Sequence, residues 1–262
     1  MIIFDHLGRK LILNSEPKRI VSLVPSQTEL ISDLCLEDSL VGVTKFCVHP
    51  SHIRQKSLIV GGTKQIHLYK IKQLKPDIIL CNKEENTLEM VASLAAIAPV
   101  HVSDINTLPD ALQLIKDYGL IFNIEDKALK ISSRIASEFE RLKDKIKYNL
   151  PISCLYLIWK DPYMCVGQNT FINEILQVLK FTNVVTKQRY PILSLEEILS
   201  KNPSVIFLSS EPYPFKEYHK AIFQKNGIKV VLVNGEYFSW YGSRLLKAVS
   251  YFESVLQFST SE

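Results

Sequence analysis

The feature that most constrains the fold is a pattern of strands and helices that occurs twice along the chain. In the first copy, residues 20–24 and 78–81 are apolar runs typical of buried strands, and a Pro76 turn precedes the second run. The second copy repeats this order with residues 154–159 and 205–208. Strands that alternate with helices predict parallel sheets covered by helices on both faces.

Three residue pairs with capping-box spacing indicate where helices begin. The pairs are Ser26 with Glu29, Asn86 with Glu89, and Ser194 with Glu197. We expect the first of these helices over residues 29–36 and the third over 195–199. Further strands are expected at 40–43, 100–102 and 230–233, and further helices at 68–74, 171–179 and 243–258.

The segment between the two copies, residues 125–149, has a different character. Apolar residues recur in it at helical spacing, and neither Gly nor Pro occurs before Pro151. About 25 residues at 1.5 Å per residue form a helix of roughly 37 Å, which is long enough to span two lobes. We therefore predict an α/β fold of two Rossmann-like lobes with parallel sheets, joined by one long rigid helix. The expected parts are an N-terminal lobe (1–122), the interlobe helix (123–149) and a C-terminal lobe (150–262).

Composition excludes several classes of protein. Hydrophobic residues make up 47% and charged residues 22% of the 262 residues, as in ordinary globular proteins. The net charge of +4 is spread along the chain, so no nucleic-acid or anionic-membrane partner is expected. No apolar run approaches the roughly 20 residues of a membrane helix, so no membrane insertion is expected.

The cysteines and the N-terminal residues indicate a compartment. The five cysteines are odd in number and form no Cys-x-x-Cys pair, which favours buried free thiols over a disulfide or metal site. Asp5 interrupts the apolar start of the chain too early for a signal-peptide core. The sequence as written therefore predicts a cytoplasmic protein, or a periplasmic one if a signal has been removed.

Aromatic residues gather in the segments that follow the predicted strands, where open α/β sheets bind their ligands. These are Phe46, Trp159, Tyr163, Tyr213, Phe215, Tyr237, Trp240 and Tyr241. They either pack the lobes together or form a wide apolar slot for a flat, bulky ligand. The presence of both tryptophans of the chain favours the slot.

Arg244 and His49 are the polar candidates for this site. Arg244 is expected where the last helix begins, a position at which a cation opposes the helix dipole. It either pairs with Glu236 or solvent, or binds an anionic group of the ligand. His49 is either a structural histidine or an axial ligand to cobalt or iron. The predicted ligand-binding residues are Phe46, His49, Trp159, Phe215, Tyr237, Trp240 and Arg244, with the largest contribution from Trp240.

Motifs of common enzymes are missing from the sequence. It contains no Gly-x-Gly-x-x-Gly, no P-loop and no Gly-x-Ser-x-Gly. We therefore predict no catalytic residues and a protein that is not an enzyme.

Four segments resemble one known family: residues 17–30, 74–79, 190–197 and 240–244. They are similar to the helical-backbone (class III) substrate-binding proteins of ABC importers for cobalamin, haem and iron-siderophores, and most of all to the cobalamin-binding branch. The resemblance implies two lobes joined by one helix. It also implies non-enzymatic binding of a corrinoid, or of a ferric siderophore or haem, in a shallow interlobe cleft, with no intrinsic cofactor.

The resemblance also implies an ABC permease as partner. Family members dock through one surface glutamate per lobe, and Glu196 matches the glutamate of the C-terminal lobe. Tyr69 stands at the N-terminal counterpart. This tyrosine and the missing export signal favour a family-like binding protein that does not serve a periplasmic importer.

Two other functions remain open at this stage. One is a cytoplasmic enzyme of tetrapyrrole metabolism, such as a chelatase, which would use His49 with Glu84, Glu85 or Glu211. The other is a scaffold that has lost its ligand.

Overall fold

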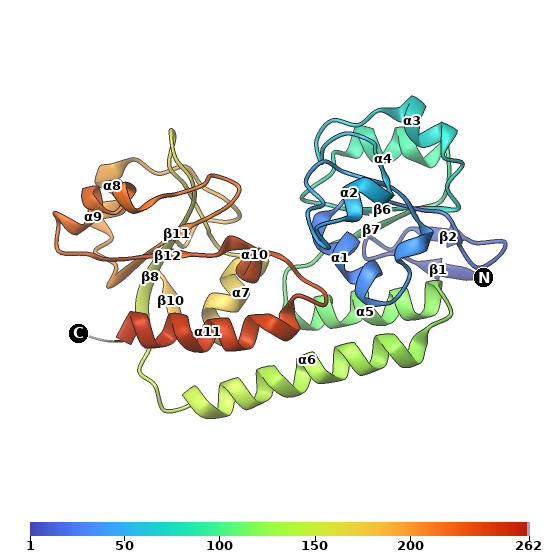
Figure 1. The fold of residues 1–262 in the computed structure, drawn as a ribbon. Helices are drawn as coiled ribbons and strands as arrows, with labels where there is room; N and C mark the ends of the chain where they lie inside the picture. Colours follow the sequence, from blue (N-terminus) through green and yellow to red (C-terminus); the bar gives the residue numbers. More distant parts are fainter. Residues whose placement is uncertain (261–262) are drawn as a thin grey trace. The chain divides into compact units, whose positions relative to one another are not determined.

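The computed structural model describes residues 1–260, which form two compact units (Figure 1). Unit 1 contains Met1–Ile105, Pro109–Ile135 and the short segment Tyr241–Arg244. Unit 2 contains Asn106–Leu108, Ala136–Trp240 and the residues from Leu245 onward. The chain therefore passes between the units several times. The division into domains at 1–122, 123–149 and 150–262 stays a prediction.

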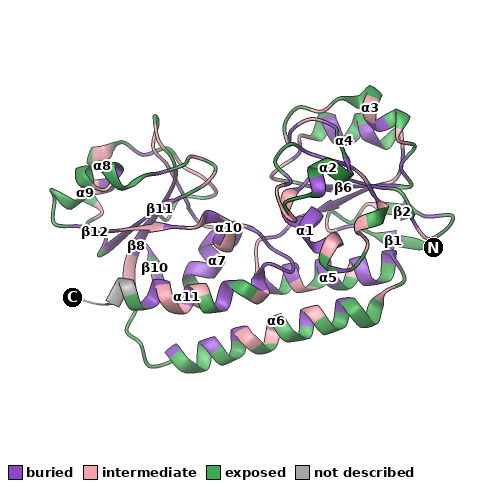
Figure 2. Ribbon diagram, viewed as in Figure 1, coloured by how far each residue is buried: buried purple, intermediate pink, exposed green. Residues whose placement is uncertain are grey.

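Unit 1 is built on a sheet of five parallel strands in the order β5-β4-β3-β6-β7. The strands are β3 (Ile20–Ser22), β4 (Leu40–Val43), β5 (Leu58–Ile59), β6 (Ile78–Asn82) and β7 (Val100–Ser103). The connecting helices are α1 (Pro25–Asp33), α2 (Ile53–Lys56), α3 (Leu68–Gln73), α4 (Leu88–Ala95) and α5 (Leu108–Ile121). The central strands β3 and β6 are buried along their whole length (Figure 2), as expected for a sheet covered on both faces.

An N-terminal hairpin extends unit 1. Its strands β1 (Ile2–Phe4) and β2 (Lys10–Ile12) pair antiparallel. The carboxylate of Asp5 attaches this hairpin, because it accepts hydrogen bonds from the Arg9 guanidinium and from the backbone N–H of Val102 on β7. The sequence analysis did not predict these two strands, whose residues alternate between exposed and buried over only three positions.

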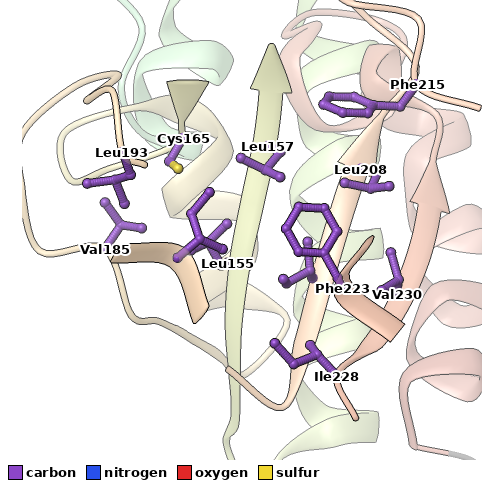
Figure 3. Packing of buried hydrophobic residues seen from close by; sticks show 12 residues of the cluster. Leu155, Leu157, Cys165, Val185, Leu193, Leu208, Phe215, Phe223, Ile228 and Val230 are labelled. Carbon is purple, nitrogen blue, oxygen red and sulfur yellow. The ribbon is translucent and has the colours of Figure 1, made fainter. Parts of the chain in front are cut away.

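Unit 2 is built on a second parallel sheet in the order β10-β8-β11-β12, to which β9 adds antiparallel to β8. The strands are β8 (Ile152–Trp159), β9 (Met164–Cys165), β10 (Phe181–Asn183), β11 (Val205–Ser209) and β12 (Lys229–Val233). Its helices are α7 (Phe171–Val178), α8 (Leu195–Ser200), α9 (Ala221–Gln224), α10 (Gly235–Ser239) and α11 (Leu245–Thr260). Leu157, Leu208 and Phe223 belong to the apolar core on one face of this sheet (Figure 3).

The long helix α6 (Glu125–Ile146) has 22 residues and runs through the boundary between the units. Its residues to Ile135 belong to unit 1, and those from Ala136 belong to unit 2. Acidic residues occupy its first turn and lysines its last turn, in agreement with the helix dipole. The predicted fold class of two parallel-sheet units with one long helix is confirmed.

The predicted helix starts are right at one site and wrong at two. Ser194 and Glu197 form a complete capping box on α8. Helix α1 instead begins at Pro25, whose fixed φ suits the first helical position, and its N-cap residue makes no side-chain cap. As a result, Glu29 lies inside α1. Helix α4 is capped by Thr87, which accepts from the backbone N–H of Met90.

Burial also determines the protonation state of cysteine thiols. All five cysteines are free, and only Cys35 is exposed. Removal from water raises the pKa of Cys81 and Cys154 to about 12, so both stay protonated at neutral pH. Among the described residues, no helix has the length and apolar character needed to cross a bilayer.

His101 is a fully buried titratable side chain of unit 1. It lies on β7 with its ring 6.0 Å from that of His6 and 5.5 Å from that of Tyr118, measured between centroids. Neither ring nitrogen has a hydrogen-bond partner within the described part of the chain. Burial is the main cause that lowers the pKa of His101 to about 4. His6 and Arg9 lower it further, while Asp5 and Asp117 oppose the shift.

We expect His101 to make the protein sensitive to mild acid. Between pH 6.5, the ordinary pKa, and pH 4 the unfolded chain takes up a proton that the folded chain refuses, so stability falls as the pH falls through this window. The full loss is about 3 kcal/mol. Urea unfolding at pH 7 and pH 4.5 should show a smaller decrease for His101→Phe than for wild type. Equal decreases would contradict this account.

Candidate functional site

The carboxyl edge of the unit 1 sheet offers a ligand position at its topological switch point, where the strand order reverses between β3 and β6. Gln27 lies at this point near the start of α1, and its side chain is fully buried. Its amide nitrogen donates to Ser103 Oγ at 2.7 Å, and its Oε1 accepts from the Tyr118 hydroxyl at 2.7 Å. These bonds fix the start of α1 against the sheet.

Two carboxylates follow β6 at the same edge. The Asn82 side-chain oxygen accepts from the backbone N–H groups of Glu84 and Glu85, at 2.9 and 3.2 Å, and so shapes the turn. Burial raises the pKa of Glu85, and the charge of Lys64 opposes that shift. The Lys64 ammonium also donates to the backbone oxygen of Glu84. This edge therefore carries two carboxyl groups with a lysine ammonium beside them.

Arg244 forms a buried ion pair with Glu29. Its Nε and Nη2 donate to the two carboxylate oxygens of Glu29 at 2.8 and 2.9 Å, and each residue is only 6% exposed. Burial raises the pKa of Glu29, while the charge of Arg244 and its hydrogen bonds act in the opposite direction. The expected exposure of Arg244 to solvent is thus wrong, because the side chain is buried against Glu29. A pairing with Glu236 stays a prediction. Glu29 is available to Arg244 because it lies inside α1 instead of capping it.

Phe46 and His49 follow β4. Phe46 is 49% exposed, and the Lys45 ammonium lies 5.0 Å from its ring centroid, a cation–π distance. His49 is half-buried. Among the described residues, no group of three or more His, Cys, Asp or Glu side chains could hold a metal ion. An axial role for His49 toward a chelated metal stays a prediction.

In unit 2 the strand order reverses between β8 and β11, so the switch point lies there. Trp159 ends β8 and is 40% exposed, and its ring packs edge-to-face on Tyr213 at 5.7 Å. Phe215 follows β11 but is only 4% exposed. Its backbone N–H donates to Ser209 O, and its ring lies in the core beside Leu208 (Figure 3). The Phe215 ring packs edge-to-face against Tyr213, with 4.8 Å between the ring centroids. It therefore supports Tyr213 and has little surface left for a ligand.

The segment after β12 forms the short helix α10. Tyr237 stacks on Tyr251 with ring centroids 4.6 Å apart. Trp240 is only 7% exposed, and its indole N–H donates to Glu211 Oε1 at 2.9 Å. The Ser239 hydroxyl donates to the same oxygen at 3.0 Å. Trp240 thereby orients the Glu211 carboxylate.

The predicted site residues divide between the units. Phe46, His49 and Arg244 belong to unit 1, and Trp159, Phe215, Tyr237 and Trp240 belong to unit 2. Sequence reasoning overlooked Glu29 as the partner of Arg244, and Gln27 and Tyr251 as supporting residues. Only the apolar run before Gln27 could have drawn attention to it, since it marks the end of a strand.

The two residues matched to permease docking are both exposed. Glu196 lies in the first turn of α8, whose start is fixed by the Ser194 capping box. Tyr69 lies on α3, and its hydroxyl accepts from the Gln73 amide at 2.8 Å.

Comparison with known sequences relates the chain to transport proteins. Residues 20–237 match the periplasmic binding protein family. An ABC transporter substrate-binding lipoprotein of Bacillus subtilis is 27% identical over 211 residues, covering 77% of this chain and 67% of the relative. A vitamin B12-binding protein of Vibrio campbellii is 24% identical over 255 residues, covering 93% of this chain and 92% of the relative.

Solved structures share the fold. The periplasmic vitamin B12 binding protein of Vibrio cholerae superposes with a TM-score of 0.80 at 23% identity, covering 94% of this chain and 99% of that one. A periplasmic heme binding protein of Pseudomonas aeruginosa gives a TM-score of 0.81 at 20% identity, with 94% of each chain covered.

The different burial of the two phenylalanines can be tested. Phe215→Ala should lower the free energy of unfolding by about 3–5 kcal/mol, because it leaves a cavity in the core of unit 2. Phe46→Ala should change it by about 0.5 kcal/mol or less, because that ring is half exposed. Chemical denaturation of both variants measures the difference. A Phe215→Ala protein as stable as wild type would contradict the core placement.

Proposed function

The chain belongs to the periplasmic binding protein family, and from this premise we propose that it binds a corrinoid without catalysing a reaction, as the substrate-binding protein of an ABC importer. The choice of a corrinoid as the ligand is supported by the match to a vitamin B12-binding protein over nearly the whole of both chains. A ferric siderophore or haem is the alternative ligand. No cofactor is proposed besides this ligand.

Charge at the two sheet edges supports a corrinoid over haem. Haem carries two carboxylates, whereas the rim of a corrin ring carries amides that can donate hydrogen bonds. The edge carboxylates Glu84, Glu85 and Glu211 accept from amides and repel carboxylates. Arg244, which was predicted to bind an anionic group of the ligand, already meets the Glu29 carboxylate.

The aromatic side chains support a flat ligand. We propose that Phe46 and Trp159, the most exposed of the predicted residues, contact the macrocycle directly. Phe215, Tyr237, Trp240, His49 and Arg244 complete the proposed set, in which the buried members position the exposed ones. Covering one aromatic face removes about 100 Å² of apolar surface from water, worth roughly 2.5 kcal/mol. That corresponds to a change in affinity of about 50- to 100-fold.

Binding is favoured over the chelatase alternative. The relatives that match this chain are named as binding proteins. A chelatase site would need a catalytic role for His49 together with Glu84, Glu85 or Glu211, which the names of these relatives do not suggest. We therefore propose no catalytic role for these four side chains.

A ligand screen tests the proposal. The purified protein is incubated separately with cyanocobalamin, haem and a ferric siderophore, desalted, and examined by absorbance. We expect it to retain cyanocobalamin, and Trp159→Ala to weaken binding at least tenfold with an unchanged melting temperature. Tyr148→Ala is the matched control, because Tyr148 is 86% exposed beyond the end of α6. Retention of none of the three ligands would overturn the proposal.

The proposed partner is an ABC permease, with the protein acting outside the cytoplasm. The relatives are a lipoprotein and periplasmic proteins, which supports the exported alternative over a cytoplasmic one. Glu196 is the proposed contact in unit 2, and Tyr69 with its neighbours would take that role in unit 1.

Reversing the charge of Glu196 tests this partner. In a host strain that lacks its own copy, Glu196→Lys should reduce uptake of labelled corrinoid severalfold while the affinity of the purified protein stays unchanged. Glu140→Lys is the control, since Glu140 is an exposed glutamate on α6. Normal uptake by the Glu196→Lys strain would exclude this docking contact.

A further inference from the structure

Residues Tyr241–Arg244, here called the strap, are a piece of unit 1 embedded in the chain of unit 2. Trp240 before the strap and Leu245 after it both belong to unit 2. The strap is therefore bonded covalently to one unit and attached by side chains to the other. The contacts between the strap and unit 1 therefore limit the motion of Trp240 and Leu245.

Three kinds of contact hold the strap on unit 1. Arg244 makes its two hydrogen bonds to Glu29, a residue 215 positions earlier. The Tyr241 hydroxyl lies 3.5 Å from the amide nitrogen of the buried Gln27. Gly242 has φ +107°, and a Cβ added there would lie 3.3 Å from Leu30 Cβ. All three contacts fall on α1, and the Tyr241 hydroxyl also forms a hydrogen bond with Ser103 on β7.

The ion pair is the contact of the strap that is most costly to break, because both charges are withdrawn from water. A buried carboxylate or guanidinium that loses its partner is costly. The bidentate geometry also fixes the orientation of Arg244, since the planar guanidinium matches both carboxylate oxygens at once. Glu29 therefore determines where the end of the strap lies.

The other end of the strap adjoins Trp240. This indole is buried and donates to Glu211, one of the carboxylates proposed to face the ligand. The peptide bond between Trp240 and Tyr241 connects the strap directly to this pair.

We propose that Glu29 is a positioning residue, which through Arg244 keeps the strap on helix α1 and thereby fixes Trp240 and the Glu211 carboxylate for ligand binding. Glu29 does not itself contact the ligand in this mechanism. Its effect on affinity rests on the function proposed above, whereas its effect on Trp240 does not.

The position of Trp240 can be followed without ligand. In a Trp159→Phe background Trp240 is the one remaining tryptophan, so acrylamide quenching of fluorescence reports its accessibility. Glu29→Gln removes the charge, and Gly242→Ala disturbs the strap without altering any charge. We expect each to raise the quenching constant at least twofold, at a temperature well below its melting transition.

Matched controls separate positioning from general destabilisation. Asp33→Asn removes an exposed carboxylate from the same helix α1. Gly227→Ala introduces a side chain at φ +74°, where an added Cβ meets nothing within 4 Å. Both controls should leave the quenching constant at the value of the Trp159→Phe protein. If Glu29→Gln fails to fold, Glu29→Asp keeps the charge but shortens the reach, and Gly242→Ala provides the independent test.

Ligand affinity supplies the second measurement, made with the native Trp159 in place. Glu29→Gln and Gly242→Ala should weaken cyanocobalamin binding at least tenfold, while both controls bind like wild type. Folded Glu29→Gln and Gly242→Ala proteins with unchanged Trp240 quenching would overturn the strap mechanism. Raised quenching with unchanged affinity would overturn the link to the ligand. If wild type binds no cyanocobalamin, the proposed function fails, and quenching alone still decides whether Glu29 holds the strap.

Discussion

The buried ion pair between Glu29 and Arg244 is the constraint on which the arrangement of unit 1 depends. Withdrawing either charge from water alone would cost several kcal/mol, so each residue needs the other in the folded state. This requirement draws a short segment from near the end of the chain onto the first helix after the first strand of the sheet. Electrostatics thus joins the two ends of the sequence within unit 1.

The two sheets have different strand orders, but both have a topological switch point. In each unit the order reverses next to the first strand of the sheet, at β3–β6 and at β8–β11. The residues after these strands are held by their neighbours: Gln27 by a polar network and Trp159 by Tyr213. Rigid support of this kind suits a ligand that is itself rigid, because little conformational entropy is lost when it binds.

Sequence reasoning recovered the sheets because parallel strands buried on both faces leave unmistakable apolar runs. Strand β4 and the start of α6 lie where the pattern placed them. Sequence reasoning failed where the same capping-box spacing occurs in two different local structures. Ser26 with Glu29 and Ser194 with Glu197 have the same spacing, but Pro25 already starts α1 and leaves Glu29 for a distant partner.

Candidate site residues were harder to place than strands, because position after a strand does not fix which way a side chain points. Phe215 folds back onto the face of its sheet through the bond from its N–H to Ser209 O, whereas Trp159 stays at the edge. The partner of Arg244 is also beyond local pattern, since no spacing rule relates residues 215 positions apart.

The long sequence separation of the Glu29–Arg244 pair has a consequence for synthesis of the chain. At ribosomal rates of about 5–20 residues per second, Arg244 is made roughly 10–40 s after Glu29, a gap of 215 residues. During that time helix α1 can pack on its sheet only with Glu29 protonated or still in contact with water. The N-terminal unit therefore cannot complete its native core during translation until Arg244 has been made.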